Sequence, residues 1–568
     1  MAVGAVAVVV VSVAGCGGPA HRVGKRHTTT TTTAPALVIG HGGTATVAVS
    51  AVPSTTLNDH TLAGDNDATR DVASTVWAQV FEIGPGLKPE LDTTVVQSAE
   101  VVSVNPQTVV YQIAPQAVWS DGVAVSAADF QYAWQSQRGG ATDIDGTPDS
   151  VASTLGYRSI ASVVSSNRGR TVTVTFKTPY ADWESLFDDL LPAHIAEQVG
   201  WNHGFDHFDP AVFVSAGPWL IQTWTPGREV VLVHNPRWWG TVPSYRRIVL
   251  EAVPDPAVMA RDLRTGRVQV AAPSTYGTSL LAQVTALPTI ESETTLGTTM
   301  LQLVFNVRKS PLQSTVVRQG IAHLVNRTAL AARVTEPLQP NTGPDGSHLY
   351  ANMQHSYVDD DYGYDTVDPT AADSLLGAGG LVTDADGTWT SHGTPVTLSL
   401  TWAEDDPWSA AAGPLVAAEL EVAGFDVTTA PVTATELEGT ILPAGAFQLA
   451  LVPVEATAYP SQLGGAYSPT ATTGSPALDA DWSGFDDPQV DTLFAQAESE
   501  LSATTAAALY QRIDRALWQE MPTLPLLSEP DFMAYSASLS GVHDDPGGLG
   551  PFWGLSGWAR LVAAPSST

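Results

Sequence analysis

The stretch that decides the fold spans residues 115–130 and reads PQAVWSDGVAVSAADF. Its second part carries a capping box, in which the Ser126 hydroxyl and the Asp129 carboxylate satisfy free backbone amides at the start of a helix. The sequence therefore predicts a helix that begins after Ser126 and reaches Trp134.

Outward from this stretch, β-branched and alternating apolar residues predict strands. These strands are expected at 44–49, 109–113, 172–176, 230–233, 248–253, 396–402, 425–432 and 448–452. Helical spacing of apolar residues predicts helices at 72–81, 316–325, 371–376, 410–423, 488–501 and 505–520. Because strands and helices alternate in the second half, we expect an α/β region with a largely open sheet.

The charge balance limits the possible partners. The chain has 58 acidic and 25 basic residues, a formal net charge of −33. Such a surface repels phosphates, so it excludes nucleic acid as a partner and argues against a lipid headgroup surface as the docking face. Arginine supplies most of the basic residues, a bias typical of GC-rich, actinobacterial coding.

Motifs of common enzyme classes are missing from the sequence. We find no Gly-x-Ser-x-Gly, no His-Glu-x-x-His, no phosphate-binding glycine loop and no Cys/His pair. We therefore expect no enzyme activity and no cofactor. Cys16 is the single cysteine, so no intramolecular disulfide is possible.

Two segments resemble metal sites but fit them poorly. His203 and His207 are spaced i,i+4, yet Gly204 favours a loop over the helix that this spacing requires. The run 359–365 is rich in oxygen ligands, as a calcium loop is, but it lacks the final bidentate Glu. We expect no metal at either place.

The N-terminus has the layout of a bacterial lipoprotein signal. An apolar run at 5–11 is followed by small residues and then by Cys16, whose thiol can take a lipid. A free cysteine after an ordinary signal peptide, or a short membrane helix, remain as alternatives, although the apolar run is too short to span a bilayer comfortably. The n-region has no Lys or Arg, which suggests a start codon further upstream. A polar, Thr-rich segment follows and predicts a tether.

Further short motifs follow the opening stretch in a fixed order. They lie at 178–180, 191–194, 216–219, 235–239, 264–268, 305–307, 317–321, 325–327 and 364–365. Together with 115–130, this order resembles family 5 extracellular solute-binding proteins of ABC transporters, which bind oligopeptides, dipeptides or nickel. The resemblance covers about residues 44–560. Segment 179–195 is also similar to mycobacterial lipoproteins that are tied to phosphatidylinositol mannoside metabolism and share the fold.

The resemblance implies an α/β, two-lobed, type II periplasmic-binding-protein-like fold. It has three domains, a hinge, and a ligand cleft between the lobes. The expected parts are a signal peptide (1–15), a disordered tether (16–43), lobe I (44–95 and 206–300), inserted domain II (96–205), lobe III (301–520) and a hinge return to lobe I (521–568).

The resemblance also suggests ligand-binding positions. Peptide binders of the family carry Trp-x-x-Asp in a loop of the C-terminal lobe, where the Asp pairs with the α-ammonium of the peptide. The matching loop 451–460 has neither residue at the expected place, but Glu455 lies one position away and can substitute. The expected ligand-binding residues are Thr56, Leu57, Asn58, Tyr276, Trp402, Glu455, Ala456, Tyr459 and Trp482.

Two roles follow from this resemblance. In the first, a monomeric lipoprotein on the extracytoplasmic face of the membrane closes on a solute, most readily an oligopeptide, and delivers it to the permease and ATPase of an ABC importer. Main-chain hydrogen bonds to strand edges would supply the affinity. In the second, the protein is a regulatory lipoprotein without a transport role, linked to phosphatidylinositol mannoside metabolism.

Overall fold

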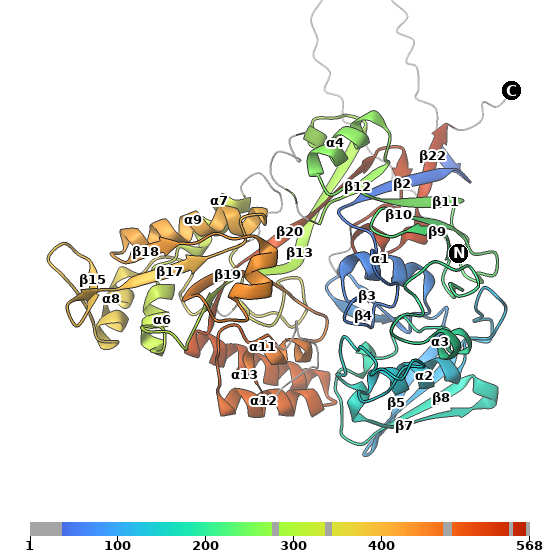
Figure 1. Ribbon diagram of the computed structural model, residues 1–568, viewed down its shortest axis with the longest axis horizontal. Helices are drawn as coiled ribbons and strands as arrows, with labels where there is room; N and C mark the ends of the chain where they lie inside the picture. The colour runs from blue at the N-terminus through green and yellow to red at the C-terminus, as the bar shows by residue number, and fades with distance from the viewer. Residues whose placement is uncertain are drawn as a thin grey trace, which may run out of the picture. The chain divides into compact units, whose positions relative to one another are not determined.

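The computed structural model describes residues 37–274, 276, 283–335, 343–359, 361–469, 480–544 and 549–563. Its largest feature is a ten-stranded mixed sheet, ordered β18-β17-β19-β13-β20-β12-β2-β11-β10-β9 (Figure 1). The strands are β2 (Thr44–Val49), β9 (Trp219–Thr225), β10 (Glu229–His234), β11 (Arg247–Ala252), β12 (Val270–Ala272), β13 (Ile290–Phe305), β17 (Thr397–Thr401), β18 (Asp426–Thr429), β19 (Leu449–Glu455) and β20 (Thr523–Ser536). The predicted strands at 44–49, 230–233 and 448–452 are confirmed within a few residues.

Two long strands, β13 and β20, form the middle of this sheet. They pair antiparallel from Ile290 opposite Ser536 to Val304 opposite Thr523, and Figure 1 shows them side by side. A bulge interrupts the register near Gly297, where an added Cβ would lie 2.1 Å from the carbonyl oxygen of Glu529. Glycine is therefore required at the bulge. The two strands join an N-terminal half of the sheet (β12, β2, β11, β10, β9) to a C-terminal half (β19, β17, β18).

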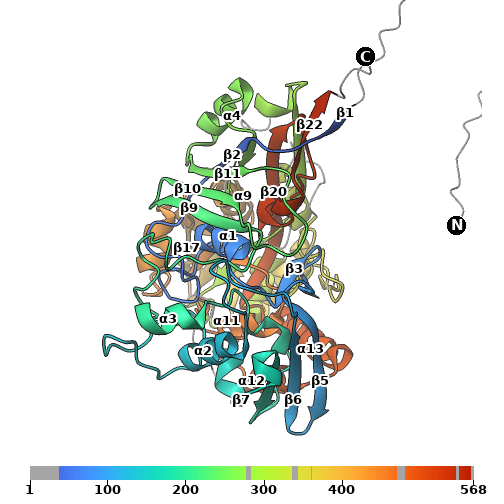
Figure 2. The same cartoon turned by 90° about the vertical axis from the view of Figure 1, so that its right-hand side faces the viewer.

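A second sheet, ordered β5-β6-β8-β7, lies in the region expected for the inserted domain. Its strands are β5 (Val96–Val104), β6 (Gln107–Ile113), β7 (Ile160–Ser166) and β8 (Thr171–Phe176). Helix α2 (Ala127–Gln137) packs against β7 and β8. Figure 2 shows α2 close to β7. The predicted capping box is confirmed: the backbone N–H of Ser126 donates to Asp129 Oδ2 at 2.7 Å, and Ser126 Oγ accepts from the N–H of Ala128 at 3.3 Å.

The first helix, α1 (Asp67–Val76), begins and ends earlier than the predicted 72–81. The side chain of Asn66 caps it by accepting from the backbone N–H of Thr69 at 3.1 Å. Trp77 is extended, and the chain then enters β3 at Phe81. The prediction placed the helix too late because the buried residues after Val76 contribute to the core from non-helical backbone.

Helices flank the C-terminal half of the sheet. They are α6 (Thr315–Ala322), α7 (Arg327–Thr335), α8 (Pro369–Ala378), α9 (Pro407–Val422), α10 (Ala434–Glu436), α11 (Gly464–Tyr467), α12 (Pro488–Ser499) and α13 (Ala503–Glu520). Most predicted helices of this half are confirmed with shifted ends. The remaining elements are α3 (Ala193–Val199), α4 (Pro256–Thr265), β3 (Phe81–Gly84), β4 (Lys88–Leu91), β14 (Leu381–Thr383), β15 (Trp389–Ser391), β16 (Thr394–Pro395), β21 (Leu539–Ser540) and β22 (Ala559–Ala563).

Residues 37–40 form strand β1 (Leu37–Gly40), so the disordered tether predicted to reach residue 43 is wrong over its last part. Cys16 and the expected signal peptide lie outside the described residues. Within the ranges that the structure describes, no helix has the length and apolar character needed to cross a membrane.

Candidate functional site

A cavity of about 390 Å³ opens where the two halves of the large sheet meet. We call it the central cavity. Its walls come from the end of β2, the first turns of α1, the loop after β12, the strands β13, β19 and β20, and a C-terminal loop. Five carboxylates line it, those of Asp67, Asp71, Glu455, Asp531 and Asp544. Such a wall favours positively charged ligand groups over negatively charged ones.

Glu455 reaches this cavity from the C-terminal half of the sheet. Its side chain is half-exposed, and Oε2 lies 3.8 Å from Nη2 of Arg70 on α1. Arg70 also pairs with Asp65 and Asp67. Partial desolvation by the surrounding chain raises the pKa of Glu455, and the charge of Arg70 opposes this shift. Although burial disfavours the charged guanidinium, these carboxylates outweigh it and raise the pKa of Arg70. The pair joins a residue of the N-terminal half to one of the C-terminal half beside the cavity.

Three of the predicted ligand-binding residues lie in the interior of the N-terminal half. Thr56, Leu57 and Asn58 are at most 2% exposed. Asn58 Nδ2 donates to the carbonyl oxygen of Trp201 at 2.9 Å, and the backbone N–H of Leu57 donates to that of Phe205 at 3.0 Å. None of the three lines the central cavity, and their contacts stabilise the loop that carries the next residue, Asp59.

Four other predicted residues also have mainly structural contacts. The Tyr276 hydroxyl donates to the carbonyl oxygen of Pro530 at 2.6 Å, and its ring is buried. Trp402 and Ala456 are buried, and Trp482 is half-buried against the core of the C-terminal half. The structure therefore does not bring these side chains together with Glu455 at one surface.

Three carboxylates, Asp59, Asp188 and Asp189, gather beside the loop that follows Asn58. We call them the acidic cluster. Asp189 Oδ1 accepts from Gln79 Nε2 at 3.3 Å, and its backbone N–H donates to Asp188 Oδ1 at 3.1 Å. His60 Nε2 donates to the carbonyl oxygen of Asp189 at 3.1 Å and lies 3.9 Å from Asp59 Oδ1. Two loops that are far apart in sequence are thus held together.

Burial makes the charged forms of these groups costly. Desolvation, with the charge of Asp188 adding to it, raises the pKa of Asp59 to about 7. The pKa values of Asp188 and Asp189 are raised well above 3.8, by desolvation first and then by neighbouring carboxylates. Close carboxylates in a low-dielectric site hold protons because the charged forms repel one another. A cation brought among them would relieve this repulsion.

Tyr459, another predicted ligand residue, approaches the same region from the C-terminal half. It is 8% exposed, and its hydroxyl has no hydrogen-bond partner among the described residues. Burial raises its pKa well above 10, and the charges of Glu184, Asp182 and Asp188 add to the shift. Nearby, the Ser461 hydroxyl donates to Asp182 Oδ2. This contact links the C-terminal half to the region of the inserted domain.

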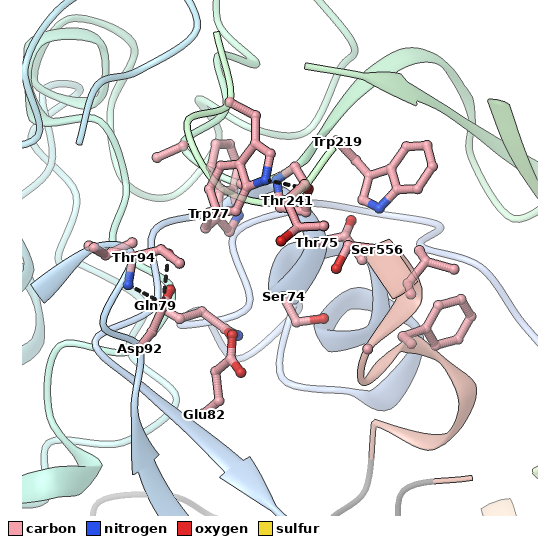
Figure 3. Close-up of a pocket in the computed structure, with 18 residues that line it drawn as sticks. Ser74, Thr75, Trp77, Gln79, Glu82, Asp92, Thr94, Trp219, Thr241 and Ser556 are labelled. Atoms are coloured by element: carbon pink, nitrogen blue, oxygen red, sulfur yellow. Dashed lines mark hydrogen bonds between the residues drawn. The ribbon is translucent and has the colours of Figure 1, made fainter. Parts of the chain in front are cut away.

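A second cavity, of about 260 Å³, lies within the N-terminal half. Figure 3 shows the indole of Trp219 and the carboxylate of Glu82 on opposite sides of it. The Trp219 Nε1–H is buried and finds no acceptor in the described part of the chain. Gln79 lines this cavity and donates to Asp189, so the cavity adjoins the acidic cluster.

The metal hypotheses gain no support from the structure. His203 and His207 lie in a loop, as predicted, and His203 Nδ1 lies 2.8 Å from Asp206 Oδ2. Over the described ranges, no group of three or more His, Cys, Asp or Glu side chains is arranged to hold a metal ion.

Neither the acidic cluster nor Arg70 was predicted from the sequence. Asp59 directly follows the predicted Asn58, and Asp188 and Asp189 directly precede the motif at 191–194. Because these three residues lie next to recognised motifs, they could have been proposed as candidate site residues. Their burial could not be predicted from the sequence, because acidic residues in loops are exposed in most proteins.

Comparison with known proteins places the fold and the motifs in context. The model of the bacterial extracellular solute-binding proteins, family 5 Middle, matches residues 87–476. The Oligopeptide-binding protein OppA of Mycobacterium bovis is 26% identical over 490 residues, 84% of this chain and 78% of that protein. The Probable monoacyl phosphatidylinositol tetramannoside-binding protein LpqW of Mycobacterium tuberculosis is 31% identical over 284 residues. That match covers 48% of this chain and 43% of LpqW, so the chain spans less than half of that relative.

Solved structures agree with this placement. The periplasmic EDTA-binding protein EppA superposes with a TM-score of 0.83 at 25% identity, covering 92% of this chain and 97% of its own. The oligopeptide-binding protein AppA from Bacillus subtilis superposes with a TM-score of 0.72 at 16% identity, covering 92% and 100%, and supports the fold alone. Both share the two-lobed type II fold that the sequence predicted. The chain therefore belongs to the bacterial extracellular solute-binding proteins of family 5.

Proposed function

We propose that the protein is a membrane-anchored, extracytoplasmic solute-binding lipoprotein that delivers an oligopeptide to an ABC importer. The observation that carries the proposal is the central cavity, which receives groups from both halves of the large sheet. Glu455 on β19 lines it, and its Oε2 lies 3.8 Å from Nη2 of Arg70 on α1, which belongs to the other half. A ligand that contacts both halves favours the conformation in which they approach, and so couples binding to closure.

The oligopeptide is the favoured ligand class for two reasons. OppA, which is named for binding oligopeptides, matches 84% of this chain. The cavity is also bordered by β2, β13, β19 and β20, and an extended peptide can pair with the main chain of such strand ends. Glu455 is placed to meet a cationic or hydroxyl-bearing part of the ligand.

The regulatory alternative has less support. LpqW matches 48% of this chain, and that match covers 43% of its own length. The longer OppA match therefore favours the transport role over a role in phosphatidylinositol mannoside metabolism.

Native mass spectrometry of the purified protein, followed by denaturation and sequencing of any released solute, tests the ligand class. We expect peptides of a few residues and a decrease in the radius of gyration by small-angle X-ray scattering when they are added back. A protein that carries no solute, and whose scattering does not change with any peptide of a mixed library, would contradict the proposal.

A further inference from the structure

The second cavity, of about 260 Å³, is a neighbour of the central cavity but lies within the N-terminal half. Its walls come from the end of α1, from β3, from the chain after β4, from the start of β9 and from the C-terminal turn at 552–556. Phe552 lines both cavities, and every other residue around the second cavity is absent from the wall of the central one. The two cavities can therefore be tested separately.

One buried donor faces the second cavity without a partner. Trp219 is 0% exposed, and its Nε1–H has no acceptor in the described part of the chain. Figure 3 shows the indole nitrogen on the side of the ring that faces the other residues around the cavity. A buried donor without an acceptor is costly, so this N–H calls for an acceptor that the chain itself does not supply.

Other tryptophans of the same half show how this group is usually satisfied. Nε1–H of Trp77 donates to the carbonyl oxygen of Leu57 at 3.2 Å, and that of Trp224 donates to the carbonyl oxygen of Pro53 at 2.8 Å. Backbone carbonyls therefore serve as acceptors where the indole packs against the chain. The Trp219 indole instead meets open space.

Three further indole N–H groups also lack an acceptor among the described residues, those of Trp119, Trp134 and Trp558. None of these three residues lines the second cavity or the central one. Of the four, Trp219 is the one that faces either cavity, with room in front of it for several molecules of the size of water.

Acceptors lie on the opposite side of the second cavity. Figure 3 shows the carboxylates of Glu82 and Asp92 there, across from Trp219. Asp92 Oδ1 accepts from the backbone N–H of Thr94 at 2.8 Å, which fixes the direction of that carboxyl group. The hydroxyl of Ser556 lies between the two sides. No Lys, Arg or His is found among the described residues that line the cavity.

This arrangement limits the ligand group to one that both accepts and donates. An ammonium only donates, so it would leave the Trp219 N–H unpaired. An anionic group could accept from Trp219, but it would meet two carboxylates and no cation. A hydroxyl group accepts and donates, and several of them on one small ring can reach both sides. Aromatic rings such as that of Phe552 add apolar surface for the carbon skeleton.

We propose that the second cavity binds an uncharged, hydroxyl-rich ring, such as a sugar. The Nε1–H of Trp219 donates to one hydroxyl oxygen of this ring, and the carboxylate of Glu82 accepts from another. This inference goes beyond the proposed function, because the site is separate from the central cavity and requires no peptide.

NMR and isothermal titration calorimetry on the purified full-length protein test the site. The probes are glucose, galactose and mannose, the anionic aldonate of each sugar, and the diamine putrescine. We expect at least one sugar to bind, its aldonate to bind at least tenfold more weakly, and putrescine not to bind. The indole N–H resonance of Trp219, identified by its loss in Trp219→Phe, should shift with added sugar until the site is saturated.

Two variants and a matched control assign the contacts. Trp219→Phe removes the donor and should weaken binding of the sugar by about two- to tenfold. Glu82→Gln should weaken it by a similar factor and also reduce the preference for the sugar over its aldonate, an effect that a merely structural role would not produce. Trp134→Phe removes an unpaired indole N–H away from both cavities and should leave binding of the sugar unchanged.

Several outcomes would overturn the proposal. No shift of the Trp219 resonance with any of the sugars, up to their highest soluble concentration, would show that water alone occupies the cavity. Binding of putrescine in preference to every sugar would contradict the uncharged ligand class. Because Glu82 is exposed, Glu82→Gln is expected to fold even if Trp219→Phe does not. Unchanged affinity and unchanged preference in Glu82→Gln would also overturn the proposal.

The proposed function fails or stands by a different measurement. Peptide binding in the central cavity should be the same in the wild type, Trp219→Phe and Glu82→Gln. A protein that binds sugars with the expected dependence on Trp219 and Glu82, but carries no peptide in native mass spectrometry, would support the second site and contradict peptide delivery alone.

Discussion

Replacing Asp59 by Asn should stabilise the ligand-free protein, and more so at high pH. Asp59 is 9% exposed, and desolvation together with the charge of Asp188 raises its pKa from 3.8 to about 7. An acid whose pKa is raised by folding holds its proton more tightly in the folded state than in the unfolded one. The stability of the protein therefore falls as pH rises between these two values. Asn has the shape of the neutral acid and cannot ionise.

The magnitude follows from this pKa difference. A pKa difference of one between the folded and unfolded states corresponds to about 1.4 kcal/mol. From pH 5 to pH 8 the folded Asp59 loses its proton, whereas the unfolded one is already ionised. The wild type should lose about 2–3 kcal/mol of unfolding free energy from this group over that range. Asp188, Asp189, His60 and Arg70 also face Asp59, and their charges change this figure but not its sign.

The measurement is urea unfolding, followed by tryptophan fluorescence, at pH 5 and pH 8 without ligand. The gain in stability from Asp59→Asn should be larger at pH 8 than at pH 5 by about 2–3 kcal/mol. Asp386→Asn, on an exposed turn, should give no such difference. An equal effect of Asp59→Asn at both pH values, or a loss of stability at pH 8, would refute the reasoning.

Three further changes test other parts of the structure. Glu455→Gln should weaken binding of a cationic or hydroxyl-bearing ligand by about 1.5–3 kcal/mol in calorimetry. Because Glu455 is half-exposed and 3.8 Å from Arg70, its loss should change stability by less than about 1 kcal/mol; a large fall in the melting temperature would instead make it a structural residue. Gly297→Ala should destabilise the protein measurably in urea unfolding, since its Cβ would lie 2.1 Å from a carbonyl oxygen, and unchanged stability would show that the bulge adapts. Cys16→Ser should move the protein from the membrane fraction to the medium; a cleaved protein that stays on the membrane would contradict lipidation.

Local chemistry explains which elements were predictable. The capping box of Ser126 and Asp129 formed as expected, because its two hydrogen bonds lie within four residues. Strands such as β2 (Thr44–Val49) and β6 (Gln107–Ile113) were recognised because their β-branched residues alternate or cluster locally. The order of short motifs along the chain was enough to predict the family and the two-lobed fold.

The long strands β13 and β20 were not predicted at all. A bulge at Gly297 shifts the register of β13, so the alternation of buried and exposed residues is broken within the strand. Their pairing joins residues more than two hundred positions apart. A pattern read in short windows does not detect such a pair.

The residues of the candidate site were also predicted only in part. Sequence alone predicted Glu455 and Tyr459 as ligand residues, because the loop at 451–460 occupies the place in the chain where the family has its ligand-pairing loop. It also named Thr56, Leu57 and Asn58, which the structure buries in the interior. Alignment gives the position of a residue along the chain but not the direction of its side chain.

What the sequence by itself determined is the family, the α/β class, most local elements and the strongly acidic character of the protein. Only the tertiary structure decided that Asp59, Asp188 and Asp189 lie together, two of them buried and Asp188 half-buried, with Tyr459 near them from the other half of the sheet. The physical reason is that helix caps and strand patterns depend on neighbours in sequence. Desolvation and the repulsion between carboxylates depend instead on neighbours in space, which the folded chain alone brings together.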